Sequence, residues 1–513
     1  MSQESDNNKR IAKNTVFLYI RMFLTMLVSL YTSRVVLNVL GVSDYGIYNV
    51  MGGVIGMLAY VNNLLSGGTS RFLTMDLGRG DEEELKRTFK LSNSLGFAAA
   101  TAVLLLGETV GLWFMNTQLN IDPVRMDAAN WVYQCALASC CLAAIQTPYT
   151  ASIIAHEKMN IYAYMSIFDV VMKLGIVFLI SWVKFDKLKL YALLMLILNL
   201  LATVVYFIVC RIKFHECRFG FSFSGKKFKE MMTYSGWNMV TAFSAVLNSY
   251  GINILLNIFF GTIVNGARGI ASQVGHVVQQ FYSNFQTASR PQIMKYYAQD
   301  NVEGMSRLIC NTSKFSAFLL ICLSIPIIFN IDGLLQIWLG QNPEYAAWFI
   351  RISLMQMIVQ CVHYPIGMGL HAIGKMKVPN LVSGFFYLIV FPFTWVAFKI
   401  GAGPILGFCV CLVFTPFALV ADLLIIRKYC GFSIRTFIRS VIVPIILIAG
   451  LGALISFFCF CFITNNTIIR TLVSSAISAI LVSATIFLVG LSKSMRQKII
   501  AVAKTRASQI LKH

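Results

Sequence analysis

Residues 14–48, NTVFLYIRMFLTMLVSLYTSRVVLNVLGVSDYGIY, form one long apolar run that contains two arginines, Arg21 and Arg34. About 20 apolar residues suffice to cross a bilayer, so the run predicts a membrane-spanning helix. Arg21 lies roughly 12 Å beyond Lys13 if each helical residue rises ~1.5 Å. A charge at that depth costs on the order of 2.5–3.5 kcal/mol, so we expect Arg21 to face a water-filled cavity or a partner.

The end of this run, with the loop Leu-Gly-x-x-x-Tyr-Gly-x-Tyr at residues 40–48, has a weaker second copy 219 residues later, with a slip of one residue in the loop. The matching positions are Tyr31 and Tyr250, Asn38 and Asn257, Gly41 and Gly261, Gly46 and Gly266, Ser70-Arg71 and Ser289-Arg290, Met75 and Met294, and Ser94 and Ser313. The sequence therefore predicts one bundle of helices that occurs twice.

Composition places the whole chain in a membrane. Of its 513 residues 57% are hydrophobic and 12% are charged, and the mean hydropathy is +0.72. A soluble protein has about 25% charged residues. The net charge of +21 does not indicate nucleic-acid binding, because the charges lie in short loops between apolar runs. This distribution favours positive-inside topology, with attraction to anionic lipids as a second effect.

The hydropathy pattern predicts an all-α, polytopic protein with fourteen spans. Lysine and arginine concentrate in alternate connecting segments, which predicts that both termini are cytoplasmic. The loop with Lys184, Lys187 and Lys189 violates this pattern. The spans lie near residues 14–36, 46–68, 91–115, 130–154, 161–183, 190–210, 234–259, 268–289, 313–331, 346–370, 380–399, 404–426, 440–462 and 469–491.

The repeat divides these spans into two bundles. Six spans separate the copies, an even number, so the two bundles share an orientation and form a parallel repeat about an axis along the membrane normal. The basic C-terminal segment, residues 492–513, is expected to lie on the inner leaflet as an amphipathic helix, with a disordered basic tail as the alternative. The expected parts are a cytoplasmic N-terminus (1–13), an N-terminal six-helix bundle (14–210), a cytoplasmic linker (211–233), a C-terminal six-helix bundle (234–426), spans 13 and 14 (427–491) and a basic cytoplasmic tail (492–513).

Motifs for enzymatic chemistry are missing from the sequence. It contains no P-loop, no HExxH and no GxSxG, and its histidines are not spaced as metal ligands. We therefore expect no enzyme activity, no cofactor and no metal. His276 and His363 fall within predicted spans, where each could belong to a proton relay or simply pack between helices. Asp81 and Glu84 are expected to cap a helix rather than to bind a metal.

The candidate binding residues are the cations and amides inside or beside predicted spans. Arg34 and Arg268 flank the two copies of the loop, and arginine is suited to forked recognition of phosphate. The alternative for both is snorkelling to the headgroups. Lys173 lies four residues from Asp169, so the two can pair on one helix face, for binding or for structure alone. Asn253 and Asn257 could line a cavity or hold helices together.

These features together resemble a known family, the Wzx-type polysaccharide flippases of the multidrug/oligosaccharidyl-lipid/polysaccharide exporter superfamily, which shares its fold with the MATE drug exporters. The resemblance rests on the predicted spans, the two bundles, the first-span Arg21, the loop at residues 40–48 and Ser70-Arg71. It implies a cleft between two bundles that opens alternately to each side, with cations that receive a lipid pyrophosphate. Arg21 matches a first-span arginine of that kind. The deep first-span aspartate typical of one MATE branch is missing.

The sequence therefore predicts a flippase that moves a polyprenyl-pyrophosphate-linked oligosaccharide across the bacterial cytoplasmic membrane for surface polysaccharide biosynthesis. A MATE-type drug or cation antiporter is the alternative. A membrane-bound polysaccharide polymerase is disfavoured, because the predicted outside loops are short. Expected partners are the lipid-linked oligosaccharide, membrane lipids, a polysaccharide polymerase and glycosyltransferases, and no nucleic acid.

Overall fold

The computed structural model describes residues 2–497 except 157, 184, 223, 226–227, 230–242, 245, 375–376, 463–466, 492 and 494. For residues 2–24 and 63–68, and for single positions in other helices, it describes the backbone alone. Within this described part every regular element is helical, which confirms the predicted all-α class. The chain forms two compact units, which are described separately below.

The first 79 residues show why the opening run organises the chain. Helix α1 extends from Ser2 to Arg79, but Gly41 has φ 81° and ψ 168° and breaks it into two helices. The same break occurs at Gly261, with φ 79°, between α8 (Ile252–Phe260) and α9 (Thr262–Ala298). Glycine is required at both positions because other residues rarely adopt a positive φ. The repeated glycines of the sequence are therefore repeated backbone breaks.

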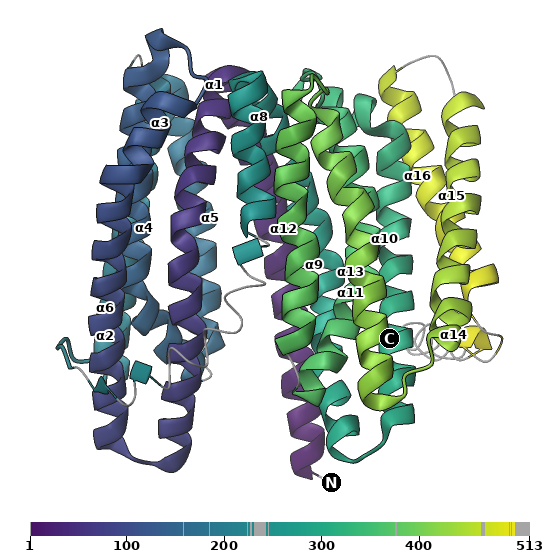
Figure 1. The fold of residues 1–513 in the computed structure, drawn as a ribbon, viewed down its shortest axis with the longest axis horizontal. Helices are drawn as coiled ribbons and strands as arrows, with labels where there is room; N and C mark the ends of the chain where they lie inside the picture. Colours follow the sequence, from purple (N-terminus) through teal and green to yellow (C-terminus); the bar gives the residue numbers. More distant parts are fainter. Residues whose placement is uncertain are drawn as a thin grey trace, which may run out of the picture. The chain divides into compact units, whose positions relative to one another are not determined.

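Unit 1 comprises residues Met1–Gln273 and Tyr387–Gly407. In Figure 1 its helices run side by side, and α4 packs against α1, α2 and α6. Buried residues of α1 such as Met51 and of α4 such as Tyr133 share one apolar core. Besides α1 and α8, its helices are α2 (Glu82–Leu106), α3 (Leu112–Gln118), α4 (Met126–Ala155), α5 (Met159–Trp182) and α6 (Lys187–Lys213), with π turns η1 at Gly107–Gly111 and η3 at Leu247–Gly251 and a 3-10 turn, η2, at Pro123–Arg125.

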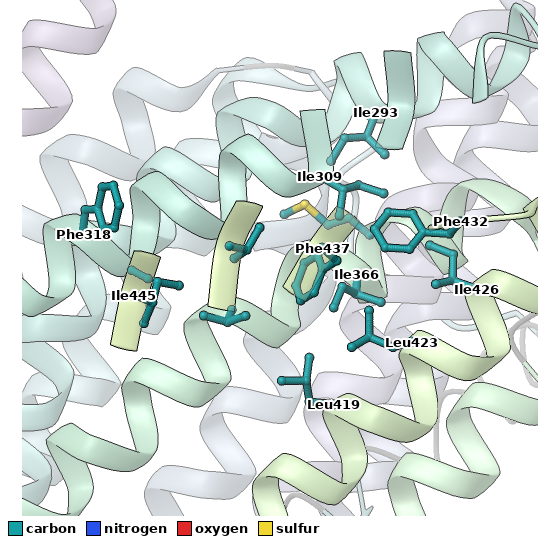
Figure 2. Close-up of a cluster of buried hydrophobic side chains, with 14 of the residues drawn as sticks. Ile293, Ile309, Phe318, Ile366, Leu419, Leu423, Ile426, Phe432, Phe437 and Ile445 are labelled. Carbon is teal, nitrogen blue, oxygen red and sulfur yellow. The ribbon is translucent and has the colours of Figure 1, made fainter. Parts of the chain in front are cut away.

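Unit 2 comprises residues Val274–Phe386 and Phe408–His513. Its core is drawn in Figure 2, where Ile309, Ile366, Leu423 and Phe437 come from four separate elements. The elements are α10 (Val302–Leu339), α11 (Ala346–Ile373), α13 (Ile405–Cys430), α14 (Ile434–Phe437), α15 (Val443–Phe462) and α16 (Thr467–Thr485), with π turns η4 at Ile438–Ile442 and η5 at Ile486–Gly490; α12 (Lys377–Lys399) and α9 extend from one unit into the other.

Helix caps follow the sequence closely. Asp81 accepts a hydrogen bond from the backbone N–H of Glu84 at 3.0 Å and begins α2, as predicted. Asn301 accepts from the N–H of Gly304 at 2.8 Å and begins α10 in the same way. An N-cap side chain satisfies one of the donors that a helix leaves open at its first turn. The acidic run at residues 81–84 is thus a helix start.

The two glycine loops of unit 1 contact each other reciprocally. A Cβ added at Gly46 would lie 1.8 Å from the carbonyl oxygen of Thr262, and one added at Gly266 would lie 2.6 Å from that of Val42. Ser43 Oγ and Thr262 Oγ1 are 3.2 Å apart and share a hydrogen bond. Residues 42 and 46 of the first loop thus meet residues 266 and 262 of the second, 220 positions on from 46 and 42. Such mutual exchange is what a two-fold axis between the loops produces.

Eleven helices in the described part of the chain are long and apolar enough to cross a membrane, and Leu247–Phe260 is a shorter apolar helix. Fourteen spans were predicted. The first two predicted spans lie in the two parts of α1 on either side of Gly41 and count as a single apolar helix, Thr25–Tyr60, and the first part of the span at 234–259 lies outside the described residues. Helix α9 does not qualify, because glutamines such as Gln273 and Gln280 lower its hydropathy. The count of fourteen stays a prediction.

The two compact units are divided inside α9, inside α12 and near the start of α13. The predicted divisions fall elsewhere, in the linker at 211–233 and after residue 426, and they stay predictions. The basic tail at 492–513 lies mostly outside the described residues, as does the second half of the linker. The side chain of Arg21 also lies outside them.

Candidate functional site

Polar side chains of α1 and α9 meet inside unit 1. Gln273 Nε2 donates a hydrogen bond to Ser29 Oγ over 2.5 Å. Helix α9 runs antiparallel to this part of α1, because Gln273 meets Ser29 while Gly266 meets Val42. Arg34 and Arg268 each lie five residues from the Ser29–Gln273 bond, in the same direction. The rise per residue puts both arginines roughly 7.5 Å from that bond along neighbouring helices.

Arg268 is fixed within unit 1. Its Nη2 donates to the backbone oxygen of Ser249 at 2.7 Å, and Ser249 belongs to the π turn η3. A π turn is a wide helical turn and is frequent at functional sites. The bond points the Arg268 guanidinium at another helix of the unit, which disfavours snorkelling for this residue. Arg34 is exposed on α1.

Lys173 forms the ion pair that its spacing predicts. Its Nζ lies 2.7 Å from Asp169 Oδ2, one turn earlier on α5, and both side chains are more than a third exposed. The aspartate neutralises the lysine locally. The geometry therefore favours the structural alternative for Lys173 over phosphate binding.

Asn253 and Asn257 belong to a buried network of amides. Asn257 Nδ2 donates to Asn265 Oδ1 at 2.9 Å, and Asn265 Nδ2 donates to Asn253 O at 2.7 Å. The backbone N–H of Asn120 donates to Asn257 Oδ1 at 2.8 Å. Asn253 Nδ2 donates to the backbone oxygen of Asn49 at 3.1 Å. Asn257 and Asn265 are fully buried, so the geometry favours helix packing over cavity lining.

Two residues of the polar networks in unit 1, Asn265 and Arg125, were not predicted from the sequence. Asn265 closes the amide network, although it lies directly beside the repeated Gly266. Arg125 was not among the predicted site residues, but its guanidinium binds both Asp44 and Asp186. Asp44 in the loop at residues 40–48 was the available signal, because a charge in such a tight loop needs a partner.

The Arg125 cluster joins three segments of unit 1. Arg125 Nε lies 3.0 Å from Asp44 Oδ1, and Nη1 lies 2.8 Å from Asp186 Oδ2. Asp186 also caps α6 through the backbone N–H groups of Leu188 and Lys189. Burial alone would raise the pKa of Asp186, but Arg125 and these N–H groups outweigh it and lower the pKa below the ordinary value. The cluster ties the glycine loop of α1 to the start of α6.

Unit 2 contains a buried histidine–carboxylate pair. His363 Nε2 on α11 lies 2.7 Å from Asp422 Oδ2 on α13, and Ser383 Oγ on α12 donates to Asp422 Oδ1 at 2.9 Å. Among the described residues no group of three or more His, Cys, Asp or Glu side chains could hold a metal ion. The arrangement can hold a proton, and it fixes three helices against one carboxylate.

The model of the family described as polysaccharide biosynthesis protein matches residues 35–346. The chain belongs to this family. The predicted resemblance is confirmed at this level. No curated protein matches this polysaccharide biosynthesis protein significantly.

Solved structures show which fold this chain has. The lipid II flippase MurJ in an inward closed conformation is similar with a TM-score of 0.68 and 13% identity, over 92% of this chain and 99% of that one. An inward-facing MATE family transporter of the MOP superfamily is similar with a TM-score of 0.66 and 13% identity, over 81% and 98%. An outward-facing MATE transporter gives 0.52 and 13%, over 80% and 95%. At such identities the likeness shows the fold alone.

Proposed function

We propose that this chain is a flippase that moves a polyprenyl-pyrophosphate-linked oligosaccharide across the bacterial cytoplasmic membrane by alternating access. Its product would enter surface polysaccharide biosynthesis. In this proposal the chain crosses the inner membrane fourteen times and keeps both termini in the cytoplasm. Glycosyltransferases would act before it, to build the lipid-linked oligosaccharide, and a polysaccharide polymerase would act after it, on the flipped product.

Membership of the polysaccharide biosynthesis family is the observation that carries the proposal. A lipid II flippase with the same fold supports transport of a lipid-linked precursor. Within unit 1, Arg34 and Arg268 supply two cations at one level of adjacent helices. A guanidinium pairs with phosphate oxygens through parallel N–H groups, so a pyrophosphate is the substrate group that suits this level.

The MATE fold keeps a drug or cation antiporter as the second candidate. Transport of an organic cation would need acidic groups along its path. In unit 1, Asp169 is already paired with Lys173, and Asp44 and Asp186 are paired with Arg125. These three acids are therefore already neutralised by cations, which favours an anionic substrate over an organic cation.

Flipping of a fluorescent polyprenyl-pyrophosphate-linked oligosaccharide in proteoliposomes tests the proposal. The double variant Arg34→Ala/Arg268→Ala should flip about 10- to 100-fold more slowly than the wild type, because each loses charge-assisted hydrogen bonds to phosphate. Arg34→Lys/Arg268→Lys should fall between them, since lysine keeps the charge and loses the fork. Arg21→Ala should abolish flipping and leave membrane insertion intact.

Arg307→Ala is the matched control. Arg307 is an exposed arginine on α10 that pairs with Glu303 at 2.8 Å, and its removal should leave the rate unchanged. If Arg34→Ala/Arg268→Ala and Arg21→Ala both flip the oligosaccharide at the wild-type rate, the proposed pyrophosphate site is wrong. Uptake of an organic cation instead of the oligosaccharide would favour the antiporter.

A further inference from the structure

The pair of His363 and Asp422 is buried among apolar residues. The two side chains are 12% and 6% exposed. Their neighbours on α11 and α13, such as Ile366, Leu419 and Leu423, belong to the core in Figure 2. A carboxylate in such surroundings is costly unless it is hydrogen-bonded and paired. Asp422 meets this need through His363 and Ser383.

Asp422 forms its ion pair with a titratable base, His363. In the described part of unit 2, no lysine or arginine forms an ion pair with it. Other titratable residues occur along the helices that surround the pair. They are His276, Tyr282, Arg290, Lys295, Tyr296 and Tyr297 on α9, Glu303, Arg307, Cys310 and Lys314 on α10, Cys361, Tyr364 and His371 on α11, and Cys409, Cys411, Arg427, Lys428, Tyr429 and Cys430 on α13.

The donor set suits a proton and not a metal ion. Sodium and other hard cations need several oxygen ligands, and one side of Asp422 is already occupied by an imidazole nitrogen. Imidazole is the side chain whose ordinary titration falls between about pH 5 and 8. With one proton fewer the pair carries a negative charge, and with one proton more it is a neutral imidazolium–carboxylate pair.

Unit 1 holds a neutral pair at the corresponding positions. Thr203 lies 219 residues before Asp422, the offset of the repeat, and Gln146 lies 217 residues before His363. Thr203 Oγ1 donates to Gln146 Oε1 at 3.1 Å, between α6 and α4. Hydrogen bonding between these two helices therefore needs no titratable group. The histidine and the carboxylate of unit 2 add two titratable groups that packing of the two helices does not require.

We propose that His363 and Asp422, with Ser383 as the positioning residue, form a proton-binding site that couples a proton to each transport cycle. This inference rests on the proposed flippase function. The pair binds a proton when it is enclosed in the apolar core, where the neutral form is stabilised. It releases the proton when water reaches Asp422 and solvates the carboxylate.

Two measurements on the full-length protein test this site. The first is a difference infrared titration of the purified protein in detergent between about pH 5 and 8, the range of imidazole. The second is the equilibrium leaflet ratio of the labelled lipid-linked oligosaccharide in proteoliposomes under a pH gradient. The variant is His363→Gln/Asp422→Thr. It replaces the titratable pair of unit 2 by the neutral Gln–Thr pair of unit 1 and keeps a hydrogen bond. Gln146→Ala in unit 1 is the matched control.

The wild type and Gln146→Ala should show coupled carboxylate and imidazole bands that titrate, and the double variant should lose the contribution of His363 and Asp422 while keeping that of the His156–Glu216 pair in unit 1. A gradient of one pH unit should shift the leaflet ratio of the wild type by up to about tenfold if one proton is coupled. In the double variant the ratio should stay near one while flipping continues. Ser383→Ala should move the titration without removing it, which a merely structural hydroxyl would not do.

Failure of the site and failure of the proposed function give different results. Titration of the pair without flipping of the oligosaccharide would support the proton site and contradict the substrate. Flipping by the wild type that ignores the pH gradient would overturn the coupling. A full response to the pH gradient in His363→Gln/Asp422→Thr would also overturn the coupling.

Discussion

The pairs Gln146–Thr203 and His363–Asp422 show how two copies of one arrangement differ. Each joins two helices of its own unit through side chains that are 57 and 59 residues apart in sequence. The first pair is neutral and the second can hold a proton. The comparison teaches that a cross-helix hydrogen bond is the structural requirement, and that charge at this position has a separate purpose.

The largest expected effect separates the two pairs by stability. His363→Ala leaves Asp422 buried without its main partner and should lower the free energy of unfolding by about 3–5 kcal/mol. Gln146→Ala removes one neutral hydrogen bond and should cost about 1 kcal/mol. Thermal denaturation in detergent, followed by circular dichroism, measures both. Equal losses would mean that Asp422 is not held as a buried charge.

A second contrast concerns the arginines that bind aspartates in each unit. Arg125 binds Asp44 and Asp186, whereas Arg351 in unit 2 binds Asp332, which is 55% exposed. Arg125→Ala leaves two partly buried carboxylates facing each other and should cost about 2 kcal/mol. Arg351→Ala should cost less than about 1 kcal/mol, because water can solvate Asp332.

The pH dependence of this second contrast follows from Asp186. Because its pKa is lowered in the folded protein, its stabilising effect is present above the ordinary value of about 3.9 and is lost as the pH falls through the lowered pKa. The stability difference between the wild type and Arg125→Ala should therefore shrink in acid. A difference that grows below about pH 4 would contradict this assignment.

The smallest contrast concerns two amides that bind cysteine carbonyls. Gln286 Nε2 donates to Cys361 O at 2.7 Å, and Asn62 Nδ2 donates to Cys140 O at 3.1 Å. Pro365 removes the N–H that would otherwise bind Cys361 O, whereas Ala144 leaves Cys140 O its helical donor. Gln286→Ala should therefore cost about 1–3 kcal/mol and Asn62→Ala about 0.5–1 kcal/mol. Denaturation of both variants under one condition gives the ranking, and a reversed order would show that Pro365 does not decide it.

Local features of the fold were predictable from the sequence. Asp81 begins a helix, Lys173 pairs with Asp169 on the next turn, and Gly41 and Gly261 mark breaks. Each depends on residues within a few positions of one another. Spacing in the sequence fixes such contacts, because neighbours on a helix face lie three or four residues apart.

Contacts between helices were not predictable in the same way. His363 was recognised as a titratable residue inside a predicted span, but nothing in the sequence places it beside Asp422. Their contact depends on how α11 and α13 are rotated and shifted against each other, and packing of the apolar core decides both. Asn253 and Asn257 were predicted either to line a cavity or to hold helices together, and their contact with Asn265 was not predicted for the same reason.

The reciprocal contact between the glycine loops has a consequence for the origin of the chain. Because residues 42 and 46 meet residues 266 and 262, the contact maps onto itself when the two copies are exchanged. Two molecules of a half-length ancestor would have made the same contact as a symmetric homodimer. Fusion of the two copies into one chain would free each loop to mutate on its own, so a fused pair can acquire an asymmetry between its halves that a homodimer cannot.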